Sequence, residues 1–157
     1  MKQPFSFYKY GFSPNGITLG IIGGGQLGKM LGIEAKRMSM KLAYLDPDMN
    51  CPASTLADQM IVSDFKDEKS ILELAEKVDV LTYEIELANS SVLKDLESRG
   101  HLIHPASGVL KTIQNKLRQK KFLKAKGIPV PAFEEVTSVE QIKKICKEFG
   151  YPSVLKA

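Results

Sequence analysis

The sequence contains no tryptophan, two cysteines and two histidines among its 157 residues. Cys51 and Cys146 lie far apart and have no CxxC or Cys/His spacing, so a disulfide framework and a zinc site are not expected. Both are predicted to be free thiols in a reducing cytoplasm. His101 and His104 flank a short predicted strand, and a structural role is expected for them.

Long hydrophobic runs are also missing. No apolar stretch approaches the roughly 18 residues that span a bilayer, so no membrane partner is expected. Residues 1–15 are rich in aromatics but lack the apolar centre of a signal peptide. We predict that they form an N-terminal extension to the first domain.

The composition is that of a globular protein, with 43% hydrophobic and 25% charged residues and a net charge of +4. The basic excess is concentrated between residues 111 and 126. This stretch is short, so a solvated helix face is expected rather than a nucleic-acid site. The basic residues are Lys111, Lys116, Arg118, Lys120, Lys121, Lys124 and Lys126.

Strand and helix patterns alternate in the first two thirds of the chain. Single helices between strands imply right-handed crossovers and a parallel sheet, so the fold class is α/β and Rossmann-like. Strands are predicted at residues 17–22, 41–46, 60–63, 78–83 and 101–104, and helices at 26–38, 67–77 and 90–99.

The alternation of predicted strands and helices ends after Pro105. A helix is predicted at 116–126, followed by a stiff linker at 127–131 with two prolines. A strand, a helix and a strand are then predicted at 133–136, 138–149 and 151–156. The predicted domains are 1–15, the extension; 16–105, the sheet domain; 106–132, a helical connection; and 133–157, the incomplete start of a second domain.

A glycine turn follows the first predicted strand. Gly23, Gly25 and Gly28 match the G-x-G-x-x-G pattern between a strand and a helix, which indicates an anion site at the helix N-terminus. Asp46 closes the second strand, where a dehydrogenase places a carboxylate for the ribose of NAD. By spacing alone, an NAD-binding domain therefore remains an alternative interpretation.

Two acidic residues follow the fourth predicted strand. Strand alternation would put Glu84 and Glu86 on one side of the chain, at the sheet edge where open α/β folds bind ligands. Carboxylates there suit a ligand with amine or hydroxyl donors, although both could also be solvated. Lys156 ends an apolar predicted strand, where its charge would need a negative partner or access to water.

Several motifs together resemble the ATP-grasp enzyme family N5-carboxyaminoimidazole ribonucleotide synthetase of purine biosynthesis. The resemblance covers residues 17–156. The motifs are GIIGGGQLGKML at 20–31, LDPD at 45–48, CPA at 51–53, AD at 57–58, TYEIE at 82–86, HP at 104–105, QNK at 114–116, KFL at 121–123 and GIPVP at 127–131.

The resemblance implies a pre-ATP-grasp domain followed by the start of an ATP-grasp domain. In this family ATP phosphorylates bicarbonate, and the carboxyphosphate carboxylates the amine of aminoimidazole ribonucleotide. It implies ribonucleotide contacts from Gly25, Gln26, Leu27, Tyr83 and Glu84. It also implies ATP-phosphate contacts from Lys116, often arginine in the family, and from Lys156.

The resemblance further implies a glycine-rich lid and magnesium ligands beyond residue 157, so no metal ligand or catalytic residue is assigned within the chain. The chain alone is expected to lack carboxylation activity, and a homodimer is compatible with the family. Three alternatives stay open. They are a formate-dependent glycinamide ribonucleotide transformylase, an NAD-dependent oxidoreductase domain and a non-catalytic binding module. The transformylase typically has Glu at the position of Gln26 and lacks the Asp46-Pro47-Asp48 run.

Overall fold

The computed structural model describes residues 16–156. The chain divides into two compact units, Met1–Leu110 and Lys111–Ala157. We refer to them as the sheet unit and the helical unit, and describe each by itself.

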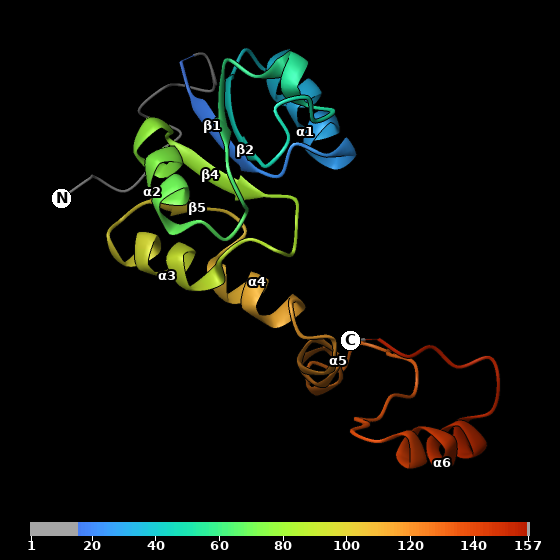
Figure 1. Ribbon diagram of the computed structural model, residues 1–157. Helices are drawn as coiled ribbons and strands as arrows, with labels where there is room; N and C mark the ends of the chain where they lie inside the picture. The colour runs from blue at the N-terminus through green and yellow to red at the C-terminus, as the bar shows by residue number, and fades with distance from the viewer. Residues whose placement is uncertain (1–15, 157) are drawn as a thin grey trace. The chain divides into compact units, whose positions relative to one another are not determined.

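The sheet unit is built on five parallel strands in the order β3-β2-β1-β4-β5 (Figure 1). This confirms the predicted parallel α/β sheet. Ile22 of β1 pairs with Leu45 of β2 and Tyr83 of β4, so these three strands end at the same edge. The strands are β1 (Thr18–Ile22), β2 (Lys41–Asp46), β3 (Gln59–Val62), β4 (Val80–Tyr83) and β5 (Leu102–Ile103).

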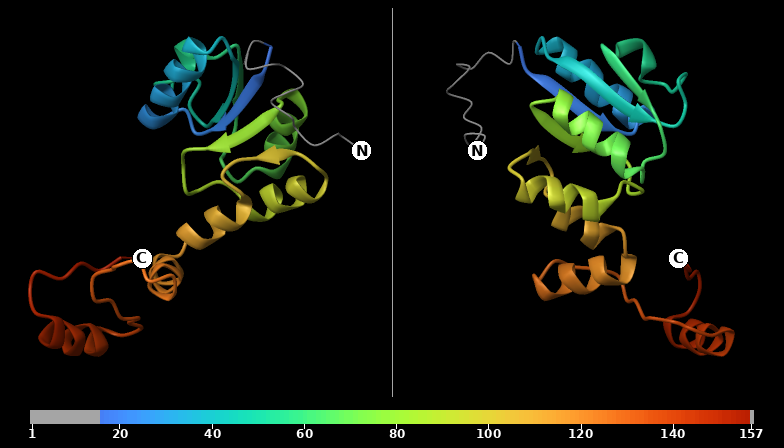
Figure 2. Two further views of the ribbon diagram at one scale, coloured as in Figure 1. Left: turned by 180° about the vertical axis from the view of Figure 1, so that it is seen from behind. Right: turned by 60° about the vertical axis from the view of Figure 1, so that its left-hand side comes forward.

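Helices cover both faces of this sheet. Figures 1 and 2 show α1 (Gln26–Arg37) on one side of the strands, and α2 (Glu68–Lys77) and α3 (Ser90–Ser98) on the other. The Asp67 carboxylate caps α2 by accepting the Ser70 N–H at 2.8 Å, and the Asn89 side chain caps α3. These three helices were predicted. The short 3₁₀ helix η2 (Ser54–Leu56) was not.

The contact between α1 and β2 is close because one position lacks a side chain. The Tyr44 hydroxyl donates a hydrogen bond to the Gly28 carbonyl at 3.0 Å, and a Cβ at Gly32 would lie only 2.0 Å from that hydroxyl oxygen. Tyr44 is fully buried, and burial raises its pKa to about 12. The hydroxyl is therefore neutral and serves to join helix to strand.

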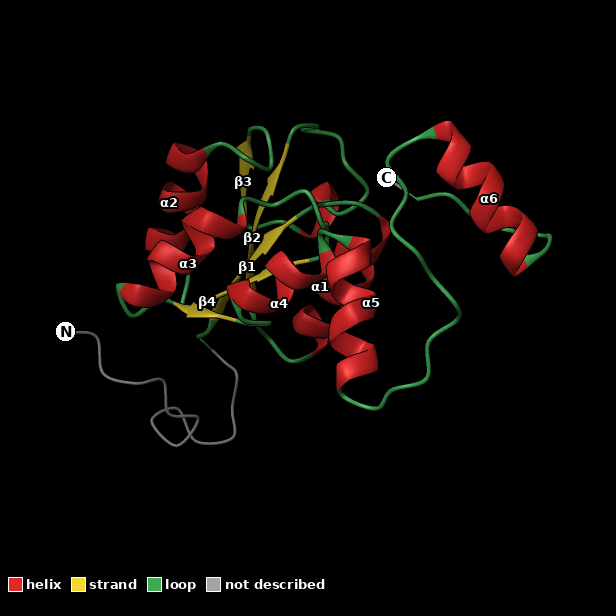
Figure 3. Cartoon of the chain, turned by 90° about the horizontal axis from the view of Figure 1, so that it is seen from below, coloured by secondary structure: helices red, strands yellow, loops and turns green. Residues whose placement is uncertain are grey.

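The helical unit contains α5 (Lys116–Ala125) and α6 (Val139–Phe149), and α4 (Ser107–Ile113) spans the boundary between the units. The predictions of α5 and α6 are confirmed, whereas α4 was missed. Asn115 caps α5 and Ser138 caps α6 through side-chain acceptors at 2.8 and 3.2 Å. Figure 3 shows the long loop, in green, that connects α5 to α6.

The strands predicted at 133–136 and 151–156 are wrong, since both segments are loops. A strand requires a neighbouring strand for its N–H and C=O groups, and no strand lies in the helical unit up to residue 156. The local pattern of apolar residues is compatible with extended backbone but cannot supply that partner. Within residues 16–156, no helix has the length and hydropathy to cross a membrane.

Candidate functional site

The candidate site lies where the strand order reverses. β1 has β2 on one side and β4 on the other, and the crossovers leave in opposite directions. In open α/β sheets, ligands bind at the carboxyl ends of strands at such a switch point. Gly23 follows β1, and Glu84 follows β4, with the Glu84 N–H bonded to the Ile22 carbonyl at 3.0 Å.

The turn after β1 can be formed only by glycine at two positions. Gly23 has a φ of +102°, and a Cβ there would lie 2.6 Å from Glu84 Oε1. A Cβ on Gly28 would lie 2.3 Å from the Gly23 carbonyl oxygen. The chain therefore passes directly from the sheet into α1. Steric exclusion of a side chain explains why glycine occupies positions 23 and 28 of the predicted pattern.

Two carboxylates accept hydrogen bonds from this turn. Asp46 is 7% exposed, and its Oδ2 accepts the Gly24 N–H at 2.7 Å while its Oδ1 accepts the Asp48 N–H at 2.9 Å. Glu84 Oε1 accepts the Gly25 N–H at 3.3 Å. Both amides at the centre of the turn are thus bonded to protein carboxylates.

This arrangement disfavours the NAD-dependent reading of Asp46. A dehydrogenase needs that carboxylate for the ribose hydroxyls, whereas both Asp46 oxygens here bind backbone amides of the sheet unit. The sequence placed Asp46 correctly at the end of β2. It did not reveal that the side chain turns back toward the glycine turn.

The segment after β2 packs on the turn through Cys51. A Cβ on Gly24 would lie 2.3 Å from the Cys51 Sγ, and the Gly24 carbonyl accepts the Ala53 N–H at 2.9 Å. Burial, and next the nearby Asp46 charge, raise the pKa of the Cys51 thiol. Cys51 is a free thiol, as predicted. Its packing contact with Gly24 was missed, because no residue spacing indicates it.

The first turn of α1 supplies backbone N–H donors beside these carboxylates. The first N–H groups of a helix have no partner within the helix, and its N-terminus carries partial positive charge. Gln26 and Leu27 occupy this turn and both are exposed, Leu27 to 62%. The fold therefore brings Gly25, Gln26, Leu27 and Glu84 to one edge of the sheet.

The predicted relation between Glu84 and Glu86 is wrong. β4 ends at Tyr83, so both glutamates lie in a turn and strand alternation does not apply to them. Glu84 is half-buried against the glycine turn, whereas Glu86 is exposed. Tyr83 is buried, and its hydroxyl lies 3.4 Å from the Ala106 carbonyl, to which it donates.

The two lysines predicted for ATP lie in the helical unit. Lys116 Nζ donates to the Ile113 carbonyl at 3.2 Å, at the C-terminal end of α4. Lys156 is exposed and lies in a loop, so the apolar strand predicted around it is wrong, and its charge has access to water.

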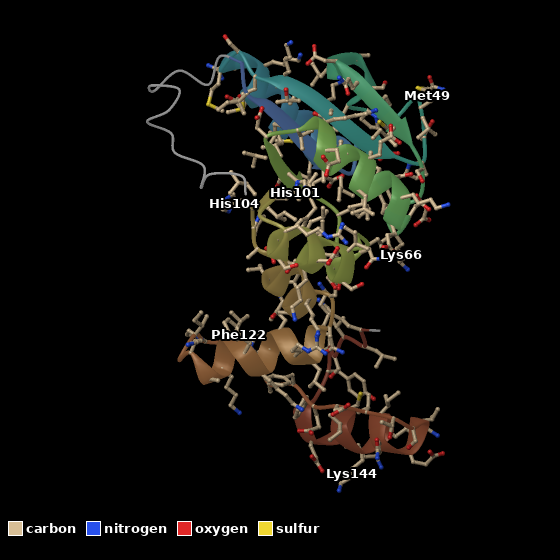
Figure 4. All side chains as sticks on the ribbon, turned by 90° about the vertical axis from the view of Figure 1, so that its left-hand side faces the viewer. Met49, Lys66, His101, His104, Phe122 and Lys144 are labelled. Carbon is tan, nitrogen blue, oxygen red and sulfur yellow. The ribbon has the colours of Figure 1, made fainter. Side chains whose placement is uncertain are left out.

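The basic face of α5 is partly occupied by the segment that follows the linker. Lys120 and Lys124 ammonium groups lie 5.5 and 5.9 Å from the centre of the Phe133 ring. Figure 4 shows Phe122 projecting from α5 and Lys144 from α6. A groove of about 460 Å³ lies along α5 and is lined by Leu117, Lys121, Lys124, Ala125, Phe133, Glu134 and Glu135.

Metal-ligating side chains do not gather in the part of the chain that the structure describes. No group of three His, Cys, Asp or Glu residues within 16–156 could hold a metal ion. Asp46 and Glu84 both face backbone amides. We therefore assign no magnesium ligand to these residues.

Comparison with known proteins agrees with this geometry. The ribonucleotide synthetase preATP-grasp domain family matches residues 17–114, which include the whole sheet and the glycine turn. The chain belongs to this family. The predicted pre-ATP-grasp fold is thereby confirmed.

Individual relatives are longer than this chain. The N5-carboxyaminoimidazole ribonucleotide synthase of Staphylococcus aureus strain MRSA252 is 38% identical over 141 residues, covering 90% of this chain and 37% of the relative. The chain thus spans about 37% of the length of the curated relatives it matches.

Solved structures give the same result. N5-carboxyaminoimidazole ribonucleotide synthetase from Thermotoga maritima matches with a TM-score of 0.75 and 43% identity, over 87% of this chain and 37% of that one. N5-carboxyaminoimidazole synthase from Aspergillus clavatus, in complex with ADP and 5-aminoimidazole ribonucleotide, matches with a TM-score of 0.78 and 34% identity. That match covers 88% of this chain and 38% of the other.

Proposed function

We propose that this chain is the N-terminal part of a cytoplasmic ATP-dependent ligase that carboxylates aminoimidazole ribonucleotide with bicarbonate in purine biosynthesis. The observation that carries the proposal is the meeting of the glycine turn and Glu84 at the carboxyl ends of β1 and β4. The family and the Aspergillus clavatus complex with 5-aminoimidazole ribonucleotide support the same ligand.

The α1 N-terminus would bind the phosphate or ribose of this ribonucleotide. Gly25, Gln26 and Leu27 are the residues we assign there, because the first amides of a helix favour an anion. The Gly25 amide is already bonded to Glu84, so the Gln26 and Leu27 amides would be the donors. The Gln26 side chain could donate to the same oxygens.

Glu84 would orient the aminoimidazole ring. A carboxylate has about four lone-pair sites, so Glu84 can keep the Gly25 N–H and still accept a hydrogen bond from the exocyclic amine. That bond would point the nitrogen lone pair toward the incoming carboxyl group. Tyr83 stays in the proposed ligand set as the last residue of β4, directly before Glu84, and its hydroxyl is bonded to the Ala106 carbonyl.

The ATP-dependent half of the reaction is proposed mainly from relatives, whose structures were solved with ADP or ATP. Lys116 and Lys156 are the residues of this chain assigned to ATP phosphates. Magnesium would neutralise charge on those phosphates, and bicarbonate would accept the γ-phosphoryl group. A homodimer belongs to the same proposal and is checked by sedimentation equilibrium.

Two competing functions are ranked lower. A formate-dependent transformylase has no support among the relatives described above, all of which are named for carboxyaminoimidazole ribonucleotide synthesis. An NAD-dependent oxidoreductase would need the Asp46 carboxylate, which is bonded to the Gly24 and Asp48 amides.

Calorimetric titration of the 157-residue chain with aminoimidazole ribonucleotide, NAD and ATP tests the proposal. We expect ribonucleotide binding that weakens about tenfold or more in Glu84→Gln, because a hydrogen bond to a charged group contributes about 1.5–3 kcal/mol. Glu148→Gln, an exposed site in α6 with the same change of charge, should bind as the wild type does.

Binding of NAD without binding of the ribonucleotide would contradict the proposal. Bicarbonate-dependent release of ADP by this chain alone would contradict the expectation that it lacks the complete ATP machinery.

A further inference from the structure

The glycine turn has the pattern of a dinucleotide-binding turn, but its central amides are bonded to carboxylates. We propose that Asp46 and Glu84 determine which anion this turn accepts: a single phosphate at the first turn of α1, and not a pyrophosphate. The inference rests on the proposed function, since it concerns the specificity of that site.

Gly25 is the decisive position. In the G-x-G-x-x-G pattern, the second glycine is the one whose backbone approaches a pyrophosphate. Here Glu84 Oε1 lies 3.3 Å from the Gly25 nitrogen, and a Cβ on Gly25 would lie 3.1 Å from the same oxygen. The Glu84 carboxylate thus occupies the place that a pyrophosphate oxygen would take.

Asp46 occupies the other central amide of the turn, that of Gly24. Its carboxylate is 7% exposed and accepts both the Gly24 and the Asp48 N–H groups. Moving Gly24 toward a ligand would leave this buried charge with a missing hydrogen bond, which is strongly unfavourable. The contact of Gly24 with Cys51 holds the turn from the same side.

Charge acts in the same direction as geometry. Repulsion between two unit charges about 4 Å apart weakens binding by roughly five- to tenfold even in water-like surroundings. The amides of Gln26 and Leu27 belong to the helix and not to the clamped turn, so one phosphate can still bind there.

The test compares inorganic pyrophosphate and inorganic phosphate as probes. Backbone amide shifts of ¹⁵N-labelled chain are followed in the wild type, Glu84→Gln, Glu84→Ala and the charge-matched control Glu148→Gln. We expect pyrophosphate to bind Glu84→Gln about tenfold more tightly than the wild type. Glu84→Ala, which also opens the Gly25 amide, should show at least this gain, and Glu148→Gln should show none.

Relative to the wild type, phosphate affinity should change less than about threefold in the three variants, and in all four proteins the shifts should centre on Gln26 and Leu27. Amide spectra without ligand show whether each variant is folded, and two different Glu84 variants keep the test open if one is not.

Equal pyrophosphate affinity in the wild type and the folded Glu84 variants would overturn the inference. So would a wild-type turn whose Gly24 and Gly25 amides shift on binding pyrophosphate. Failure of the proposed function is read separately. In that case aminoimidazole ribonucleotide would not shift the Gln26 and Leu27 amides of the wild type, whatever the pyrophosphate result.

Discussion

Both units of this chain contain helices with side-chain N-caps, but their interiors are very different. Asp67 and Asn89 cap helices of the sheet unit as Asn115 and Ser138 cap those of the helical unit. Yet every buried side chain among the described residues belongs to the sheet unit, and none lies at 111–156. Capping therefore defines where helices begin, but the parallel sheet is what creates a core.

The consequence is a difference in how each unit can be stable. Helices of 10 and 11 residues, such as α5 and α6, are marginal in water without tertiary packing. Apolar residues of the helical unit remain exposed, including Phe122 at 50% and Val139 at 59%. We expect substitutions to be costly in the sheet unit and tolerated in the helical unit. Four experiments test this difference.

The largest contrast should be in thiol reactivity. Cys51 is 4% exposed and packed on Gly24, whereas Cys146 in α6 is only partly buried. Modification of Cys51 requires local opening of the core. It should therefore be at least about a hundredfold slower than modification of Cys146.

This is measured with a chromogenic disulfide reagent on Cys51→Ser and Cys146→Ser variants at neutral pH. In denaturant both thiols should react alike. Equal rates in the folded chain would show that the sheet unit opens as readily as the helical one.

The next contrast uses two helical leucines. Leu74 in α2 is fully buried, and Leu123 in α5 is partly exposed. Leu74→Ala should lower the free energy of unfolding by about 2–5 kcal/mol, because a cavity is left in the core. Leu123→Ala should cost about 1 kcal/mol or less. Urea denaturation followed by circular dichroism measures both, and similar losses would contradict the comparison.

A smaller effect should appear where the glycine turn meets the core. Gly24→Ala places a methyl group 2.3 Å from the Cys51 Sγ, so a loss of about 1–3 kcal/mol is expected. Adding Cys51→Ala should recover part of that loss, which the double-mutant cycle reports as a coupling energy.

Gly108→Ala is the matched control, because a Cβ there meets no atom within 4 Å. It should leave stability unchanged or slightly increase it, since alanine favours a helix. Strict additivity of Gly24→Ala and Cys51→Ala would show that the thiol does not constrain the turn.

The smallest effect concerns an ionic contact on the surface of the sheet unit. Asp58 accepts hydrogen bonds from Lys36 Nζ at 2.5 Å and from the Leu42 N–H at 2.6 Å, and these lower its pKa below the ordinary 3.8. A lowered folded-state pKa contributes stability above pH 3.8, and this is lost as pH falls through the folded value.

Asp58→Asn should therefore cost less than about 1 kcal/mol at pH 7, because the Lys36 and Asp58 side chains are still 34% and 43% exposed. The difference from the wild type should shrink toward pH 2. Urea titrations at both pH values measure it, and a difference that persists at pH 2 would rule out an ionic origin.

Much of the sheet unit was predictable because its signals are local. Short apolar and β-branched runs, three of which end next to glycine or proline, indicated the strands, and helical spacing with acidic or polar first residues indicated α1, α2 and α3. Local signals failed where a partner decides the outcome. The segments 133–136 and 151–156 have strand-like patterns but no neighbouring strand, and Glu84 lies beyond the end of β4, where alternation no longer holds.

The alternation of strands and helices, the glycine turn after β1 and the polar residues at the strand ends could all be derived from the sequence alone. These follow from the period of apolar residues and from conformations that glycine alone adopts easily. The contacts of Asp46, Cys51 and Glu84 depend on the folded chain, since their partners in Gly24 and Gly25 lie 22, 27 and 59 residues away in sequence. Parallel pairing brings these residues to one edge of the sheet. There two carboxylates bind the amides of the glycine turn, although the spacing of its glycines is compatible with dinucleotide binding.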